Sequence, residues 1–375
     1  MSLLSSCVLP ARNRSTRGNA WRPTPVLRPD GCNLNAMREK SVADIGDGDG
    51  DGDDNEEDDE VKPPKMLATI LAPIANLNAL LLSTPVHAGL FPYALLPTLH
   101  AARISLLHRA LSEKAWEATS DDVRRTRGKP TWAYNIVGFL VMCWGGSLIN
   151  NVILTSTPPF LLSIHPFINY VSVHLLLSVV LSLFPSLTPP LYLVDTSLPL
   201  LDGCLRTQAV VVSLDMVARS PNAAVRSSLL IQLIAGVVGS TGGGQLAGTL
   251  GLLNPAGWTL STPPLLGARS VLPIIDIYAA FFATAAFGLT TASNAAYEPW
   301  MARLHAGKTG PILSPAGGRA LATLIFAAAF AYRALMLHWV AAPPAATTSK
   351  KTRAVNGSAG ANGHPKTSSR AKAAA

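Results

Sequence analysis

The sequence predicts an all-α integral membrane protein with about seven transmembrane helices. Of its 375 residues, 49% are hydrophobic and only 14% are charged, and the mean hydropathy is +0.30. A water-soluble domain of this length needs more charged surface than that. Apolar runs of about 20 residues, the length that crosses a bilayer as a helix, alternate with short polar stretches rich in proline.

Seven apolar runs are long enough to span a membrane. Polar residues and proline pairs, such as Pro158–Pro159 and Pro189–Pro190, separate them. The predicted spans are residues 87–111, 132–154, 161–184, 191–217, 225–253, 271–291 and 320–340. A shorter run, 66–82, is predicted to be an interfacial or entry segment, with an eighth span as the alternative.

The membrane domain, 66–341, is predicted to lie between two disordered tails. Residues 1–65 lack apolar periodicity and contain a strongly acidic run, whereas residues 342–375 are basic and of low complexity. The serine- and arginine-rich start could alternatively be a mitochondrial transit peptide, although it has no clear amphipathic helix. The acidic run from Asp47 mimics the spacing of a calcium loop but has no flanking helices, so it favours a tail that attracts cations weakly.

Several functional classes find no support in the sequence. The four cysteines form no CxxC or Cys/His pattern, so neither a disulfide framework nor a zinc site is indicated. The net charge of +8 resides in tails and beside apolar runs, where lipid headgroups explain it better than nucleic acid. No P-loop, G-x-S-x-G or HExxH motif occurs, so we expect no enzyme and no cofactor.

The distribution of basic residues predicts the orientation. The loop after the first span is the most basic in the membrane domain and should face the cytosol. Its basic residues are Arg109, Lys114, Arg124, Arg125, Arg127 and Lys129. With seven spans, the C-terminal tail is also cytosolic and the N-terminal tail lies on the other side.

An internal repeat is visible. Trp144–Gly145–Gly146–Ser147 in the second span and Thr241–Gly242–Gly243–Gly244 in the fifth are each followed by Ser–Thr–Pro–Pro. Units of three spans insert in opposite directions, which predicts an inverted 3+3 repeat (87–184 and 191–291) plus one C-terminal helix (320–340). Chance similarity between proline-rich loops is the alternative.

The glycine clusters have two interpretations. Glycine can open the backbone of a span beside a wet permeation path, or it can let two helices pack closely. The candidate pore or hinge residues are Gly145, Gly146, Ser147, Gly242, Gly243 and Gly244.

Charged residues within the spans are the other functional signal, because they are costly in hydrocarbon. Asp202 and Arg206 are four residues apart and are predicted to pair on one helix face, and Asp276 lies in the sixth span. A purely structural ion pair, with snorkelling at helix ends, is the alternative. His100 and His174 are predicted to be interior histidines whose hydrogen bonds are satisfied.

Taken together, these motifs resemble the trimeric intracellular cation (TRIC) channel family. The matching residues are Phe91–Pro92 with His100, Trp132, Cys143–Trp144–Gly145–Gly146, Pro158–Pro159, Val217–Ala218–Arg219, Gly236, Gly242–Gly243–Gly244, Trp258 and Pro263. The resemblance covers about residues 75–340 and implies a homotrimer with one potassium-permeable pore per subunit. It also implies an endoplasmic reticulum or nuclear membrane and a role as counter-ion pathway for calcium release or uptake.

The chain departs from the family at its lipid-binding positions. Asp215 stands where the family has a lysine that holds a phosphoinositide, Met216 replaces an acidic residue, and Gly239 replaces an arginine. Arg219 alone carries over from the basic pair. A phosphoinositide ligand is therefore implied only weakly.

Two rival functions remain open at this stage. A small-solute transporter could use the same inverted repeat and would show slow, saturable flux. A non-conducting membrane scaffold would use the glycines only to pack helices.

Overall fold

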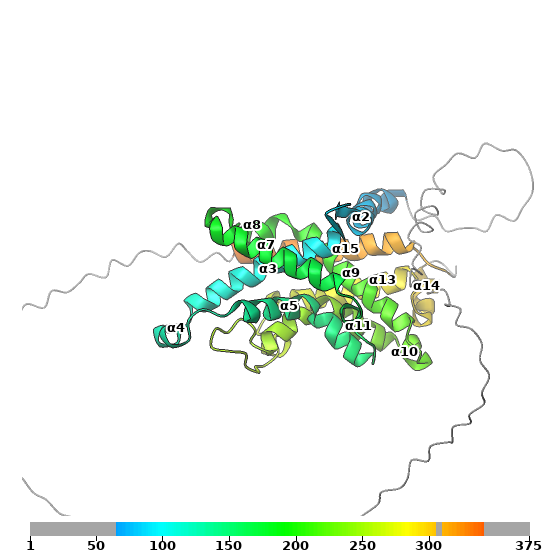
Figure 1. The fold of residues 1–375 in the computed structure, drawn as a ribbon. Helices are drawn as coiled ribbons and strands as arrows, with labels where there is room; N and C mark the ends of the chain where they lie inside the picture. The colour runs from blue at the N-terminus through cyan, green and yellow to red at the C-terminus, as the bar shows by residue number, and fades with distance from the viewer. Residues whose placement is uncertain (1–64, 305–309, 341–375) are drawn as a thin grey trace, which may run out of the picture. The chain divides into compact units, whose positions relative to one another are not determined.

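A computed structural model describes residues 65–304 and 310–340 of the chain (Figure 1). The two predicted tails, including the acidic run, lie outside the described residues except for Lys65. All described residues belong to one compact unit of the chain.

The described part of the chain is mostly helical. Its long helices are α2 (Lys65–Ser83), α3 (Leu95–Glu117), α5 (Trp132–Ile153), α7 (His165–Leu183), α9 (Pro199–Ala218), α11 (Leu229–Thr249), α13 (Ile275–Thr290) and α15 (Pro315–Leu335). Shorter helices are α4 (Asp121–Arg127), α6 (Pro159–Leu162), α8 (Leu191–Ser197), α10 (Ala223–Ser227), α12 (Pro264–Gly267) and α14 (Glu298–Leu304). Single turns η1 (Pro185–Leu187), η2 (Leu272–Ile274) and η3 (Ala295–Tyr297) and a π-helical turn η4 (Met336–Val340) complete the helical elements.

One small hairpin precedes α3. Strands β1 (Pro85–His87) and β2 (Phe91–Ala94) pair antiparallel. The predicted first span, 87–111, was therefore placed too early: its first residues form the hairpin, and the helix runs from Leu95 to Glu117. Pro92 lacks a backbone N–H, and Gly89 is a weak helix former, so the segment that contains both favours a turn over a helix.

Five helices in the described residues are long and apolar enough to cross a membrane, so the chain is a multi-pass α-helical membrane protein. They are Trp132–Ile153, His165–Leu183, Leu229–Thr249, Leu272–Thr290 and Pro315–Val340. Helices α3 and α9 are similar in length to these five, but they carry several charged residues. The apolar part of α2, Thr69–Ser83, is shorter.

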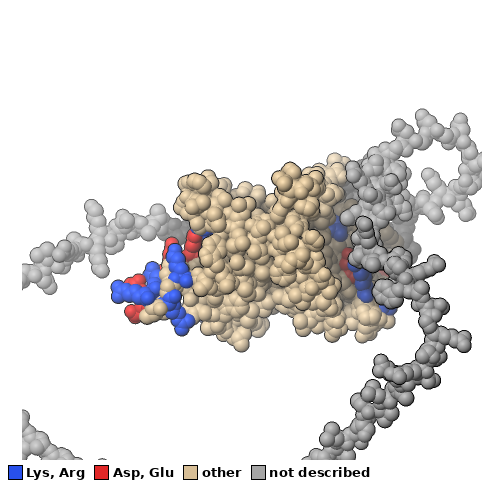
Figure 2. Space-filling model, in the orientation of Figure 1, with Lys and Arg blue, Asp and Glu red and all other residues tan. Residues whose placement is uncertain are grey.

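The outer surface of the bundle supports a membrane setting. Large apolar side chains on α7 are exposed, including Leu176 at 65% and Leu183 at 68%, and Phe282 on α13 is exposed at 59%. Exposed apolar surface of this extent is unfavourable in water and favourable against lipid. Figure 2 shows that charged side chains gather towards the ends of the molecule, one group where α4 lies, and leave the middle of this face uncharged.

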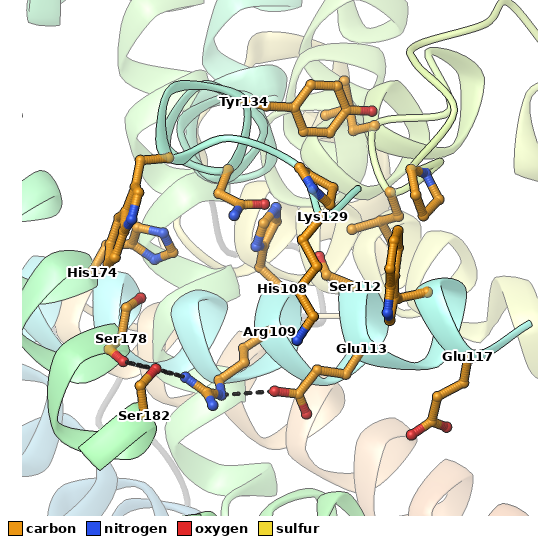
Figure 3. Close-up of a pocket in the computed structure, with 17 residues that line it drawn as sticks. His108, Arg109, Ser112, Glu113, Glu117, Lys129, Tyr134, His174, Ser178 and Ser182 are labelled. Atoms are coloured by element: carbon orange, nitrogen blue, oxygen red, sulfur yellow. Dashed lines mark hydrogen bonds and ion pairs between the residues drawn. The ribbon is translucent and has the colours of Figure 1, made fainter. Parts of the chain in front are cut away.

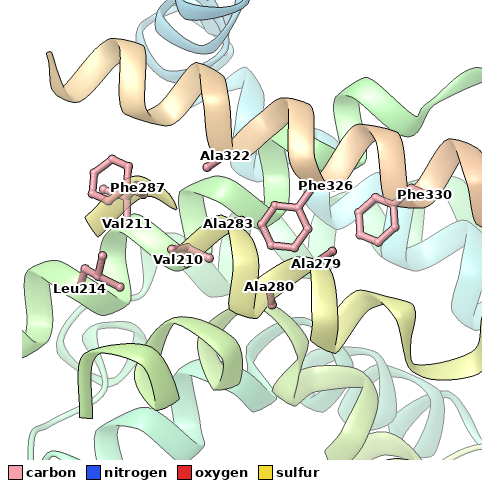
Figure 4. Close-up of a cluster of buried hydrophobic side chains, with 10 residues drawn as sticks. All are labelled: Val210, Val211, Leu214, Ala279, Ala280, Ala283, Phe287, Ala322, Phe326 and Phe330. Atoms are coloured by element: carbon pink, nitrogen blue, oxygen red, sulfur yellow. The ribbon is translucent and has the colours of Figure 1, made fainter. Parts of the chain in front are cut away.

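Helix packing defines the interior. Helix α11 packs against α5, α9 and α13, while α15 packs against α2, α9 and α13, and α3 packs against α7. The largest apolar core joins α9, α13 and α15 (Figure 4). Its residues are Val210, Val211, Leu214, Ala279, Ala280, Ala283, Phe287, Ala322, Phe326 and Phe330.

Two predicted spans are interrupted where capping residues occur. The fourth, 191–217, divides into α8 and α9 at Leu198, because Pro199 lies in the first turn of α9 and has no N–H to continue the preceding helix. The fifth, 225–253, divides at Ser228, whose hydroxyl accepts a hydrogen bond from the Ile231 amide at 3.2 Å and caps α11.

Candidate functional site: a charged cavity among the central helices

The two glycine clusters meet each other across the contact between α5 and α11. A Cβ atom on Gly145 would lie 2.9 Å from the Cα of Gly243, and one on Gly242 would lie 2.7 Å from the Cα of Gly146. A Cβ on Gly243 would overlap the carbonyl oxygen of Met142. Only glycine permits this approach of the two backbones.

Both helices continue through their glycines without a break. The described conformation therefore corresponds to the close-packing interpretation of the clusters, and no backbone is unwound at Gly242, Gly243 or Gly244. The predicted repeat aligns Gly145 with Gly242 and Gly146 with Gly243. The contacts are reciprocal in this alignment, since each first glycine meets the second glycine of the other helix.

A cavity of about 490 Å³ opens beside this crossing. Helices α3, α5, α9 and α11 supply most of its wall, and Tyr170, Phe330 and Arg333 complete it. Of the predicted site residues, Gly146, Ser147, Gly243, Gly244, Asp202 and Arg206 line this central cavity. Gly145, Gly242 and Asp276 do not.

The ion pairing in this region differs from the prediction. Asp202 pairs with Arg103 of α3, with 3.1 Å between Arg103 Nε and Asp202 Oδ1, and not with Arg206. The same guanidinium donates from Nη2 to Asp195 of α8 at 2.7 Å. Arg103 is only 6% exposed and each aspartate is 15% exposed. Because Arg103 lies in the interior, Asp202 pairs with it and not with Arg206 on its own helix.

The network extends to the end of α15. His338 in the π-helical turn η4 lies 3.1 Å from the second carboxylate oxygen of Asp195. Arg103 and Asp195 thus connect the cavity wall to His338, which is 21% exposed.

Arg206 makes a different contact. Its guanidinium donates a hydrogen bond to the backbone carbonyl of Ser240, so it bridges α9 and α11. Asp276 and Asp202 attract Arg206 electrostatically, whereas Arg333 and Arg103 repel it. Oδ1 of Asp276 is buried and has no hydrogen-bond partner among the described residues.

Other polar residues tie the helices together. Asn150 is fully buried and donates to the hydroxyl of Ser213 and to the carbonyl of Ala235, both at 2.9 Å. His100 lies 2.9 Å from the Tyr170 hydroxyl, and His174 lies 2.8 Å from the Ser105 hydroxyl. The prediction that His100 and His174 are satisfied interior histidines is confirmed.

Of the predicted lipid-binding positions, Met216 and Gly239 line this cavity, whereas Arg219 and Asp215 lie apart from it. Arg219 pairs with Asp215 at 3.3 Å on the surface at the end of α9, and both side chains are largely exposed. Arg219 is therefore already paired with Asp215. No group of His, Cys, Asp or Glu in the described ranges is arranged to hold a metal ion.

Two residues of this ion-pair network, Arg103 and His338, were not predicted from the sequence. Arg103 lies inside the apolar run 87–111, where a charged residue is costly and was a visible signal. His338 gave no signal, because its partner Asp195 is 143 residues away in the sequence.

No protein-family model, curated protein or solved structure matches this chain. The class that the fold and site define is therefore a multi-pass α-helical membrane protein with a charged interior cavity beside a glycine-mediated helix crossing.

Proposed function

We propose that this protein is a channel for monovalent cations, permeable to potassium, in an intracellular membrane. The observation that carries the proposal is the central cavity, which places polar and charged groups among helices of membrane-spanning length. A membrane protein tolerates such groups where they face a wet path. The resemblance to the TRIC family is the basis for proposing potassium as the ion and an intracellular membrane as the location.

Two of the three arginines at the cavity lie close to carboxylates. Arg103, Arg206, Arg333 and Asp202 line it. Arg103 pairs with Asp195 and Asp202, and Asp276 attracts Arg206. A conducting site must attract ions weakly enough to release them. A carboxylate that is already paired with an arginine attracts a passing cation only weakly.

Arg206 is the proposed gate. Because its guanidinium bridges to the Ser240 carbonyl, it ties α9 to α11 beside the cavity and defines a closed conformation. Release of this hydrogen bond would free one carbonyl for a cation and move one positive charge. Asp276, whose Oδ1 lacks a partner in the described structure, is the acceptor proposed for the open state.

The architecture proposed is seven spans with an inverted repeat. At 1.5 Å per residue, α3 and α9 extend about 35 Å and about 30 Å, enough to cross the hydrocarbon core. Arg103 on α3 and Asp202 and Arg206 on α9 line the cavity, and these charges lower the hydropathy of the two helices. The reciprocal glycine contacts are those expected if a two-fold axis relates the two repeats.

Planar bilayer recording tests the proposal. Purified protein in asymmetric potassium chloride should give discrete openings that reverse near the potassium potential. Arg206→Gln should raise the open fraction by about tenfold or more, because the closed state loses a hydrogen bond from a charged donor. Arg219→Gln removes an exposed arginine near the end of the same helix and should behave as wild type.

Two results would contradict this proposal in different ways. Unchanged gating of Arg206→Gln would remove Arg206 from the gate but leave the channel. Silent bilayers with folded wild-type protein would remove the channel itself; saturable solute uptake into vesicles would then favour a transporter, and no flux of any kind a scaffold.

Glycosylation tests the proposed sidedness in the endoplasmic reticulum or nuclear envelope. Asn13–Arg–Ser and Asn356–Gly–Ser are both acceptor sequons. With seven spans and a cytosolic C-terminus, expression in microsomes should allow a glycan on Asn13 and none on Asn356. A glycan on Asn356, detected as a mass shift lost in Asn356→Gln, would reverse the orientation. Subunit stoichiometry by native mass spectrometry would test the proposed homotrimer.

A further inference from the structure

A second cavity, of about 540 Å³, lies at the end of the bundle near α4 (Figure 3). Its walls are formed by the last turns of α3, the segment before α5, the start of α5, the side of α7 and the segment after α11. It is separate from the central cavity, because no residue lines both. Its volume falls in the range of about 300–1,000 Å³ typical of small-molecule sites.

A buried histidine forms part of this end cavity. His108 is only 3% exposed, and its ring makes no hydrogen bond within the part of the chain that the structure describes. The ring faces α5 at Gly138, because a Cβ atom added there would lie 3.2 Å from Nε2. Because His108 lines the cavity, a ligand atom within it could form a hydrogen bond with the imidazole ring.

The cavity rim carries two cations and two anions. Arg109 is held by the Ser182 hydroxyl at 3.1 Å and by Glu113 at 3.1 Å. Lys129 and Glu117 have no ion pair among the described residues, and Lys129 extends across the cavity toward α3 (Figure 3). One free ammonium and one free carboxylate are therefore presented to a ligand.

The position of the cavity indicates the source of that ligand. Trp116 and Trp132 line it, and tryptophan is enriched where a membrane protein meets lipid headgroups. The neighbouring α4 is rich in arginine, and charged residues gather at this end of the molecule (Figure 2). Phosphate bound by cations and an amine bound by a carboxylate and an indole ring are the two halves of a zwitterionic headgroup.

We propose that the end cavity binds the headgroup of a zwitterionic glycerophospholipid, with its phosphate at Lys129 and His108 and its ammonium at Glu117 and Trp116. The site does not depend on conduction, since it shares no residue with the central cavity. It also lies apart from the exposed pair of Arg219 and Asp215.

Binding of short-chain lipids to the full-length protein tests this proposal. Delipidated protein in detergent would be titrated with dihexanoyl phosphatidylethanolamine and the bound lipid counted by native mass spectrometry. Lys129→Gln and His108→Asn should each weaken binding about tenfold or more, as expected for the loss of a hydrogen bond to a charged phosphate. Lys114→Gln, an exposed lysine on α3 outside the cavity, is the matched control and should bind as wild type.

Two further ligands separate the parts of the proposal. Dihexanoyl phosphatidylglycerol has the phosphate but no amine, so Glu117→Gln should weaken the ethanolamine lipid and leave the glycerol lipid unchanged. Glycerophosphoethanolamine has no acyl chains and should bind weakly; equal affinity would overturn the membrane source. Full binding by Lys129→Gln, an exposed position where folding is not at risk, would overturn the site.

Discussion

Gly243→Ala is expected to destabilise the protein strongly, although it adds a single methyl group. The new Cβ would overlap the carbonyl oxygen of Met142, which belongs to the backbone of α5 and cannot rotate away. The two helices would have to separate by about 1 Å, and overpacking of this kind costs about 1–3 kcal/mol or more. The midpoint of thermal unfolding in detergent, followed by circular dichroism, would measure the loss.

The neighbouring glycine provides the control. Gly244 is on the same helix, but a Cβ there would meet nothing within 4 Å. Gly244→Ala should therefore be neutral or slightly stabilising, because alanine is favoured over glycine in a helix by up to about 1 kcal/mol. Equal unfolding midpoints for the two alanine variants would mean that α5 and α11 do not meet at Gly243.

The glycine clusters were visible in the sequence, but their role, close packing or backbone opening, was not. Two glycine clusters in equivalent spans were visible, and both close packing and backbone opening were compatible with them. The choice between these depends on what faces the missing side chains, and the partner of Gly243 is the backbone of Met142, about 100 residues away. The local sequence pattern does not show which distant residue faces Gly243.

The ion pairs show a second limit of local reasoning. Spacing of four residues brings Asp202 and Arg206 to one face of α9, yet each side chain has a better partner on another helix. Inside a low-dielectric bundle, the pair with the least water around it is favoured over the nearest neighbour in sequence. Tertiary packing, which sets burial, decides the pairing.

Hydropathy divides the four helices that form most of the cavity wall. Helices α5 and α11 are apolar enough to be recognised as spans, whereas α3 and α9 carry several charged residues. Charges such as Arg103 that lower the hydropathy of these helices are among those that give the cavity its chemistry. Charged residues of the proposed pore therefore also weaken the membrane signal.

Arg103→Met is expected to have the other large effect, because it leaves Asp195 and Asp202, each only 15% exposed, without their common cation. Removing one partner from a buried ion pair costs about 3–5 kcal/mol. Most of the variant should fail to accumulate as monodisperse protein, and the remainder should unfold at a clearly lower temperature. Arg109→Met, on the same helix, breaks a partly exposed pair with Glu113 and should cost about 1 kcal/mol or less.

Rescue distinguishes a lost ion pair from lost packing. If the cost of Arg103→Met is electrostatic, adding Asp195→Asn and Asp202→Asn removes the stranded charges and should restore most of the unfolding midpoint. Failure of the triple variant to recover would assign the loss to the volume of the arginine side chain. Because His338 contacts only Asp195 in this network, His338→Gln should lower the midpoint far less than Arg103→Met. If His338→Gln lowered the midpoint more than Arg103→Met, the main partner of Asp195 would be His338 in η4 and not Arg103 in α3.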